Sequence, residues 1–362
     1  MPHVRKITLL IIVCLAAALS SCGAPSTHLM YATLQGTNGV AAFRVRNSNA
    51  TFTNIVGSPY PTGNSPSAVV VDPARKFAYV ANQVDNTISR FAIDSKIGSL
   101  SEVTPRVDTG FSPRAMLMNS SGNRLFVLNQ ASNNITVYSV NSGALAEISG
   151  SPFLVSTGPV AMVLTPSGKF LYVLNSNLAV VFGYSVSSSG ALTAIPGPPT
   201  PTGTGNQATG AGPFAIAVDP GEKFVYVANT LQNTLAILTI NSSTGALAPI
   251  VDSPFLTGTS PTSLAVTTSG PYLYVANFGS NNVTAFSIDS SGEPTEISGS
   301  PFSTVGAPIL LVSDPNGNFL YSVNQTTKLI SALQITSGTG ALTNGPSTEI
   351  TTAAASSVFV TQ

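Results

Sequence analysis

The chain has 362 residues, and only 8% of them are charged, against about 25% in an average soluble domain. The formal net charge is zero, and no stretch combines clustered basic residues with aromatic ones, which excludes a nucleic-acid-binding surface of the usual kind. With two cysteines and two histidines, the sequence also excludes a disulfide framework and a His-ligated metal centre. We therefore expect neither a cofactor nor a metal.

The first residues carry the features of an export signal. Arg5 and Lys6 precede an apolar stretch at 7–19, which is too short to cross a bilayer comfortably. The following Leu-Ser-Ser-Cys at 19–22 resembles a bacterial lipoprotein signal, in which cleavage before the cysteine is followed by lipidation of its thiol. This predicts a signal peptide over 1–21, a lipidated Cys22 with a short tether over 22–27, and an exported protein anchored in the bacterial cell envelope. An ordinary secretory signal is the alternative.

A single repeated pattern occupies the rest of the chain, residues 28–362. The clearest copies are FAYVANQVDNTISRFAID (77–94), FVYVANTLQNTLAILTI (224–240) and LYVANFGSNNVTAFSID (273–289). Their aromatic anchors recur every 46 to 54 residues, at Tyr31, Tyr79, Phe126, Tyr172, Tyr226, Tyr274 and Tyr321. A repeat of this length, built only from strand-like segments, is typical of a β-propeller with four strands per blade.

Each repeat predicts four antiparallel strands. Apolar runs such as PSAVVVDP (66–73) predict the innermost strand, and the YVAN-type run predicts the second. The fourth strand ends in a Ser-Pro-aromatic element, where proline suits an outer edge. Because the repeats begin on a second strand and end on an innermost one at 356–361, we expect the C-terminal strand to complete the N-terminal blade and close a seven-bladed ring.

The Tyr-Val-Ala-Asn element, the Asn-Thr that follows it and the Pro-x-x-Leu-Ala-Val strand before it resemble the YVTN-type propellers and the related seven-bladed lactonase family. The resemblance implies the propeller fold over about residues 28–362. It also implies a 6-phosphogluconolactonase-like hydrolysis of a sugar or related lactone. Such chemistry usually needs a positioned base and a cation for the developing oxyanion. His28, the single histidine after the signal, lies beside the expected lipid anchor and is a poor candidate for that base.

Residues repeated in most blades are expected to build the blade. The asparagines that end the second strands suit turn geometry, because their amides hydrogen-bond nearby backbone. The Asp-Pro pairs that end innermost strands are interpreted as turn initiators. The two sets are Asn82, Asn129, Asn175, Asn229, Asn277 and Asn324, and Asp72-Pro73, Asp219-Pro220 and Asp314-Pro315.

Positions that depart from the repeat are better candidates for a site. Arg114 follows Pro113 at the start of an innermost strand and is the only charged residue at that level, close to the expected channel mouth. Asp85, Arg106 and Asp108 come from loops that should share this face. Together the four could bind an anionic or polar ligand, and a solvated charge cluster is the alternative. The other repeats have Ser67, Val160, Phe214, Thr262, Ile309 and Ser356 at the position of Arg114.

These observations leave three functions open. The main hypothesis is a membrane-anchored extracytoplasmic module that binds an unidentified small molecule or envelope protein at the channel-mouth face. The alternative is a lactonase-type hydrolase, and the third possibility is a structural surface protein without a small-molecule site. The long spacing between Tyr172 and Tyr226 adds a Pro- and Gly-rich loop at 196–213, which is expected on the same face.

Overall fold

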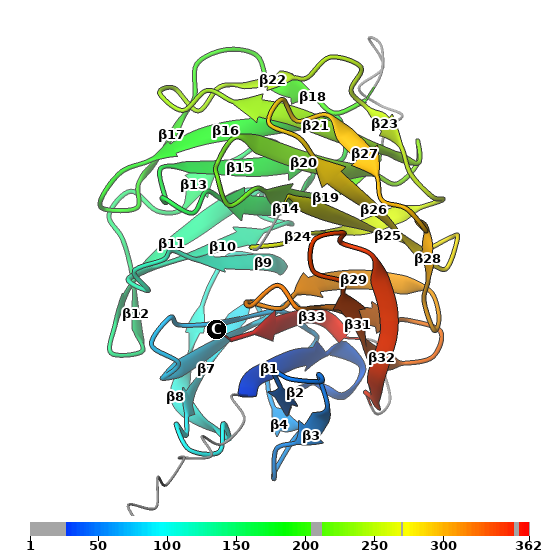
Figure 1. Ribbon diagram of the computed structural model, residues 1–362. Coiled ribbons are helices and arrows are strands. Elements are labelled where there is room, and N and C mark those ends of the chain that lie inside the picture. Colours follow the sequence, from blue (N-terminus) through cyan, green and yellow to red (C-terminus); the bar gives the residue numbers. More distant parts are fainter. Residues whose placement is uncertain (1–26, 204–211, 269–270, 351–354, 362) are drawn as a thin grey trace, which may run out of the picture.

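Seven antiparallel sheets form a ring around a central channel in the computed structural model, which describes residues 27–203, 212–268, 271–350 and 355–361 (Figure 1). We name the sheets blade A to blade G in chain order. This confirms the predicted all-β, seven-bladed propeller. Each innermost strand lies next to the innermost strands of its two neighbours, so the seven together line the channel. The expected signal peptide, Cys22 and most of the tether lie outside the described residues.

The first four blades have the following strands, each written from the channel outwards. Blade A has β33 (Ala355–Val360), β1 (Thr27–Leu34), β2 (Gly39–Arg46), β3 (Phe52–Asn54) and β4 (Tyr60–Pro61), with the short 3-10 helix η1 (Gln35–Thr37) between β1 and β2. Blade B has β5 (Pro66–Val71), β6 (Phe77–Asn82), β7 (Thr87–Ile93) and β8 (Leu100–Asp108). Blade C has β9 (Pro113–Met118), β10 (Arg124–Asn129), β11 (Asn134–Asn141), β12 (Ala144–Glu147) and β13 (Phe153–Leu154). Blade D has β14 (Pro159–Leu164), β15 (Phe170–Asn175), β16 (Val180–Val186), β17 (Leu192–Ala194) and β18 (Thr200–Pro201).

The last three blades repeat this order. Blade E has β19 (Pro213–Val218), β20 (Phe224–Asn229), β21 (Thr234–Ile240), β22 (Leu247–Pro249) and β23 (Phe255–Leu256). Blade F has β24 (Pro261–Val266), β25 (Tyr272–Asn277), β26 (Asn282–Ile288), β27 (Pro294–Glu296) and β28 (Phe302–Ser303). Blade G has β29 (Pro308–Ser313), β30 (Phe319–Asn324), β31 (Leu329–Ile335) and β32 (Leu342–Glu349). In five blades the outermost strand is thus broken into two pieces that both pair with the third strand.

The C-terminal strand closes the ring, as expected. Strand β33 pairs antiparallel with β1, which places the two ends of the fold side by side (Figure 1). The ladder ends in a reciprocal pair: the N–H of Leu29 donates to Oγ1 of Thr361 at 3.0 Å, and the N–H of Thr361 donates to the carbonyl of Leu29 at 2.9 Å. The first blade therefore takes its innermost strand from the other end of the chain, and β1 is not left as an open edge.

His28 belongs to this seam and not to the channel mouth. Its side chain is buried, and its Nε2 lies 3.0 Å from Oδ1 of Asp314 and 2.9 Å from Nδ2 of Asn316. Both partners lie just after the last residue of β29, whereas the channel-mouth residues lie at the first residues of the innermost strands. His28 therefore joins blade A to blade G at the end of the ring opposite Arg114.

The repeated asparagines are buried and hold the loops of their own blades. In five of the six blades the Nδ2 group bridges the loop to the next strand: Asn129 donates to Oδ1 of Asn134 and Oγ1 of Thr136, both at 2.8 Å. Asn82 makes the equivalent pair of bonds in blade B, and Asn277 makes it in blade F. Asn175 differs, because its Nδ2 donates to the carbonyl of Thr157 in the preceding loop at 2.9 Å. The interpretation of these residues as blade-building is confirmed.

The Asp-Pro pairs also behave as predicted. Oδ1 of Asp72 accepts the backbone N–H groups of Lys76 and Phe77 at 2.7 and 2.6 Å, which closes the turn between β5 and β6. Asp219 repeats both bonds in blade E. These two carboxylates thus satisfy turn amides within their own blades, whereas Asp314 also contacts His28 of blade A.

Neighbouring blades are joined by buried tyrosines of the second strands. The hydroxyl of Tyr172 donates at 2.8 Å to the carbonyl of Gly245, which lies in the turn before β22 of the next blade. Gly245 has a φ of +73°, and a Cβ there would collide with Phe170, so this turn requires glycine. Tyr31 and Tyr274 make the same bond to Gly98 and Gly340. Burial raises the pKa of each of these phenols, which keeps them neutral donors.

We predict that deletion of residues 356–362 will strongly destabilise the ring, because it removes an innermost strand and exposes the edge of β1. The midpoint of thermal unfolding, followed by circular dichroism, should fall well below that of the full chain. Adding a synthetic peptide of residues 355–362 should restore part of the loss. A truncated protein that melts with the full-length protein would refute the closing role of β33.

Candidate ligand site at the mouth of the channel

A β-bulge at the start of every innermost strand shapes the channel mouth. Each of these strands begins with proline or, in β33, with alanine, and its register against the second strand shifts directly after that residue. A bulge inserts one extra residue, whose side chain does not follow the regular alternation of side chains between the two faces of the strand. The residues at this point are Ser67, Arg114, Val160, Phe214, Thr262, Ile309 and Ser356, and all seven line one cavity. Sequence reasoning placed these residues at one level without recognising the bulge.

The cavity has a volume of about 800 Å³ and occupies the central channel. Among the described residues that line the cavity, Arg114 is the only charged one. This confirms the expectation that Arg114 lies near the channel mouth. In a neutral, partly desolvated cavity, one guanidinium attracts an anionic or strongly polar group more strongly than it would in open water.

Contacts on three sides hold Arg114 in place. Its Nε donates to the carbonyl of Val160 in blade D at 2.7 Å, and its Nη1 lies 3.5 Å from Oε1 of Gln130. The guanidinium carbon lies 5.6 Å from the centre of the Phe214 ring, within cation–π range. Desolvation lowers the pKa of Arg114, but a guanidinium stays charged in proteins. The side chain is therefore a positioned cation.

Glutamines of several blades add polar groups to the channel mouth. Gln83 and Gln325 directly follow the repeated asparagine in blades B and G, and Gln35 follows Leu34, which replaces that asparagine in blade A. All three line the cavity, and Gln130 in the same position of blade C contacts Arg114. The recurrent Asn-Gln pair was the sequence signal for these residues. Val160 and Phe214 give the mouth an apolar side in blades D and E.

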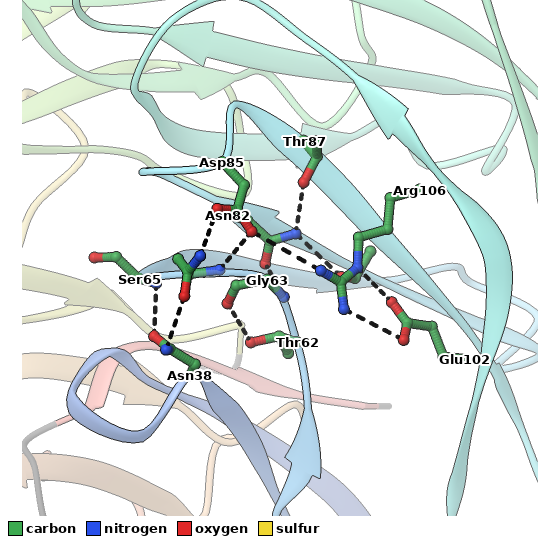
Figure 2. A network of polar contacts seen from close by, with 11 residues as sticks. Asn38, Thr62, Gly63, Ser65, Asn82, Asp85, Thr87, Glu102 and Arg106 are labelled. Carbon is green, nitrogen blue, oxygen red and sulfur yellow. Dashed lines mark hydrogen bonds and ion pairs between the residues drawn. The ribbon is translucent and has the colours of Figure 1, made fainter.

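The other three predicted site residues lie in blade B, where Asp85 and Arg106 form a pair apart from Arg114. Arg106 donates to Oε1 of Glu102 at 2.7 Å, and its Nη1 lies 3.9 Å from Oδ2 of Asp85 (Figure 2). Asp108 ends β8; its backbone carbonyl accepts the hydroxyl of Tyr138 at 2.6 Å. No ion pair joins Arg114 to Asp85 or Asp108 in the described chain. Ligand binding by these four residues stays a prediction.

Asp85 acts as a clip between two loops of blade B. It accepts the backbone N–H of Asn64 at 2.8 Å and the side-chain amide of Asn64 at 2.7 Å. Ser132 accepts the N–H of Phe111 in the same way in blade C, and Ser280 accepts that of Thr259 in blade F. These bonds from Asn64 hold the pKa of Asp85 below its usual value, with a smaller contribution from Arg106. The position is therefore a structural one that blade B fills with a carboxylate.

Other kinds of site find no support in the described residues. No group of three or more His, Cys, Asp and Glu side chains there is arranged to hold a metal ion. None of the helical segments described is long and apolar enough to span a membrane. Residues 204–211 of the long loop predicted on this face lie outside the described residues.

The comparisons with known proteins agree with this architecture. A family model described as "Lactonase, 7-bladed beta-propeller" matches residues 24–160 and 157–360. The periplasmic gluconolactonase of Pseudomonas aeruginosa has a similar structure, with a TM-score of 0.74 and 17% identity over 93% of this chain and 99% of that one. A Bacteroides fragilis protein provisionally named a 6-phosphogluconolactonase is also similar. Its TM-score is 0.77 and its sequence identity is 19%, over 93% of this chain and 98% of that one. At such identities these structures share the fold alone, and no curated protein matches the sequence.

We predict that replacing Asp85 by alanine will lower the free energy of unfolding by about 1 kcal/mol, the usual net value of a hydrogen bond, while Asp85→Ser will retain most of it. Serine suffices because blades C and F use it at this position. Because the folded-state pKa of Asp85 is lowered, its contribution is present above the unfolded pKa and is lost as the pH falls through the folded value. Urea unfolding at neutral and acidic pH measures both effects; an Asp85→Ser protein as unstable as Asp85→Ala would contradict the clip.

Proposed function

The chain belongs to the seven-bladed lactonase family of β-propellers, and we propose that it hydrolyses a lactone bound at the mouth of the channel. The observation that carries the proposal is Arg114, a fixed cation on a bulge that faces an otherwise neutral cavity. The substrate would be a sugar lactone or a related polar lactone. The glutamines of blades A, B and G would bind its hydroxyl groups, and the apolar side in blades D and E would pack against its ring.

The proposed reaction places Arg114 at the carbonyl oxygen of the lactone. Water attacks the carbonyl carbon, and a new C–O bond forms as negative charge develops on that oxygen. A guanidinium aimed at this charge stabilises the tetrahedral intermediate. The ring C–O bond then breaks, and the products are a carboxylate and a hydroxyl group. Because Nε is tied to Val160, the terminal nitrogens are the part of Arg114 available for this contact.

A specific observation favours a second candidate, a binding module without catalysis. The residues that line the cavity in the described chain include no Asp, Glu or His that could act as a general base. In the lactonase proposal the proton of the attacking water would therefore pass to solvent or buffer. A binding module would need only the cation and the amides, and would bind a small polar anion or an envelope protein at the same mouth.

Anchorage in the cell envelope is the second part of the proposal. It rests on the Leu-Ser-Ser-Cys sequence at 19–22 and on the short separation between Cys22 and β1. β1 begins at the face of the ring opposite the channel mouth. An anchored protein would therefore direct its channel mouth away from the membrane.

We predict that Arg114→Ala will lower kcat/KM for hydrolysis of a sugar lactone such as glucono-1,5-lactone by about a hundredfold, as loss of an oxyanion-stabilising donor does. Arg106→Ala removes a cation from the rim without touching the cavity and is the matched control. Hydrolysis can be followed by acid release in a pH-stat. Wild-type protein with no rate above the uncatalysed reaction would refute the lactonase proposal. Arg114-dependent binding of gluconate in calorimetry would then support the binding module.

We predict that Cys22→Ser will move the protein from the membrane fraction to the soluble fraction of cells, because the thiol that would carry the lipid is lost. Cys14→Ser is the matched control, since it changes a cysteine within the expected signal and should leave the protein in the membrane fraction. Fractionation followed by immunoblotting distinguishes the two. A Cys22→Ser protein that stays with the membrane would show that lipidation of Cys22 is not its anchor.

A further inference from the structure

A second cavity lies far from the channel, at the outer edge between blades D and E. Its volume is about 510 Å³, within the range of about 300–1,000 Å³ that is usual for small-molecule sites. One wall comes from residues 181–184 and 194–201 of blade D, and the other comes from residues 245–249 of blade E. Every residue that lines it is uncharged.

The cavity lies where four other blades have an aromatic side chain, which blade D lacks. Four other blades carry an aromatic residue on the outer piece of the fourth strand, paired with the second residue of the third strand: Tyr60, Phe153, Phe255 and Phe302. In blade D the same position, opposite Val181, holds Thr200. Phe153 packs into the core shared by blades C and D, where Tyr184 and Leu192 also lie. Thr200 instead bonds to the carbonyl of Leu247 at 3.3 Å, which leaves the space of a ring open.

Blade D also lacks a serine that, in other blades, accepts a hydrogen bond from a backbone N–H beside this space. In four blades the serine of the Ser-Pro-aromatic element accepts a backbone N–H of the third strand: Ser58 from Ala42, Ser151 from Val137, Ser253 from Ile237 and Ser300 from Ala285, at 2.8 to 3.0 Å. Pro198 stands at that serine position in blade D, and a proline side chain accepts no hydrogen bond. The corresponding third-strand residue is Gly183, which lines the cavity. Its N–H therefore has no serine acceptor.

We propose that this cavity binds a small, uncharged aromatic molecule, whose ring occupies the space left by the missing side chain and whose polar substituent accepts a hydrogen bond from the N–H of Gly183. The absence of charge in the lining disfavours an ionised ligand, because its desolvation would go uncompensated. A free molecule fits better than a partner's side chain. The strand that carries the aromatic residue in the other blades is already in place as β18, so only the ring is missing.

Acetophenone and ethylbenzene are suitable probes, because they have similar shapes and only acetophenone has an acceptor. We expect acetophenone to bind the full-length protein saturably and to shift the amide resonance of Gly183. Thr200→Phe restores the residue of the other blades, and should fill the cavity and weaken binding about tenfold or more, equivalent to at least 1.4 kcal/mol. Thr193→Phe adds the same ring on the neighbouring strand β17, outside the cavity lining, and should leave binding unchanged.

Pro198→Ser tests the hydrogen bond separately from the cavity. It restores the serine acceptor, so it should weaken the binding of acetophenone and leave that of ethylbenzene unchanged. Thermal unfolding with and without probe shows whether each variant folds, and bound probe should raise the midpoint of the wild type. No saturable binding of acetophenone, or equal binding by Thr200→Phe, would overturn the proposal. So would binding of a phenylalanine-containing peptide without binding of either probe, which would identify a protein partner.

Discussion

The pairing of β33 with β1 is the interaction on which the rest of the ring depends. A blade in the middle of the chain is held by covalent connections on both sides, but blade A exists only because the chain returns to complete it. The reciprocal bonds between Leu29 and Thr361 fix the last rung, and His28 with Asp314 and Asn316 fixes the adjoining corner of blade G. With the ring closed, each innermost strand keeps a neighbour on both sides. The bulges at their first residues then face a channel of defined width.

Within the closed ring, the repeat determines where side chains lie, and individual substitutions determine what they do. The bulge position carries a hydroxyl in three blades, and that hydroxyl ties its blade to the next: Ser356 to the carbonyl of Pro66, Ser67 to that of Pro113 and Thr262 to that of Pro308. Arg114 makes the same kind of tie with Nε, to the carbonyl of Val160. Because its side chain is longer, the terminal guanidinium nitrogens can still face the cavity. A cation is thus added to the channel mouth without loss of a contact between blades.

The fold could be predicted almost completely from the sequence, whereas the site could be predicted only in part. The spacing of the tyrosines and the phase of the two chain ends determine blade number and closure, because each repeat must bury its faces against its neighbours. Arg114 was located by the same argument, because it is the one charged residue at a position that the repeat places at the start of each innermost strand. Asp85 was grouped with Arg114 because its loop was expected on the same face of the ring. Its partner is the backbone of Asn64, and no pattern in the sequence shows which amide a loop carboxylate reaches. The repeat itself held the better signal, since Ser132 and Ser280 occupy the position of Asp85 in blades C and F.

The two candidate sites depart from the repeat in opposite ways. At the channel mouth, Arg114 adds a charge to a position that is otherwise neutral, and its structural tie is kept. Between blades D and E, side-chain groups that the other blades have are missing. Thr200 replaces an aromatic residue and Pro198 replaces a serine, while Gly183 has no side chain on the adjoining strand. A half-buried ring contributes core packing, so its loss costs stability unless something refills the space. The intact blades beside it provide the comparison that a non-repetitive protein lacks, because they show which groups the empty space is shaped to hold.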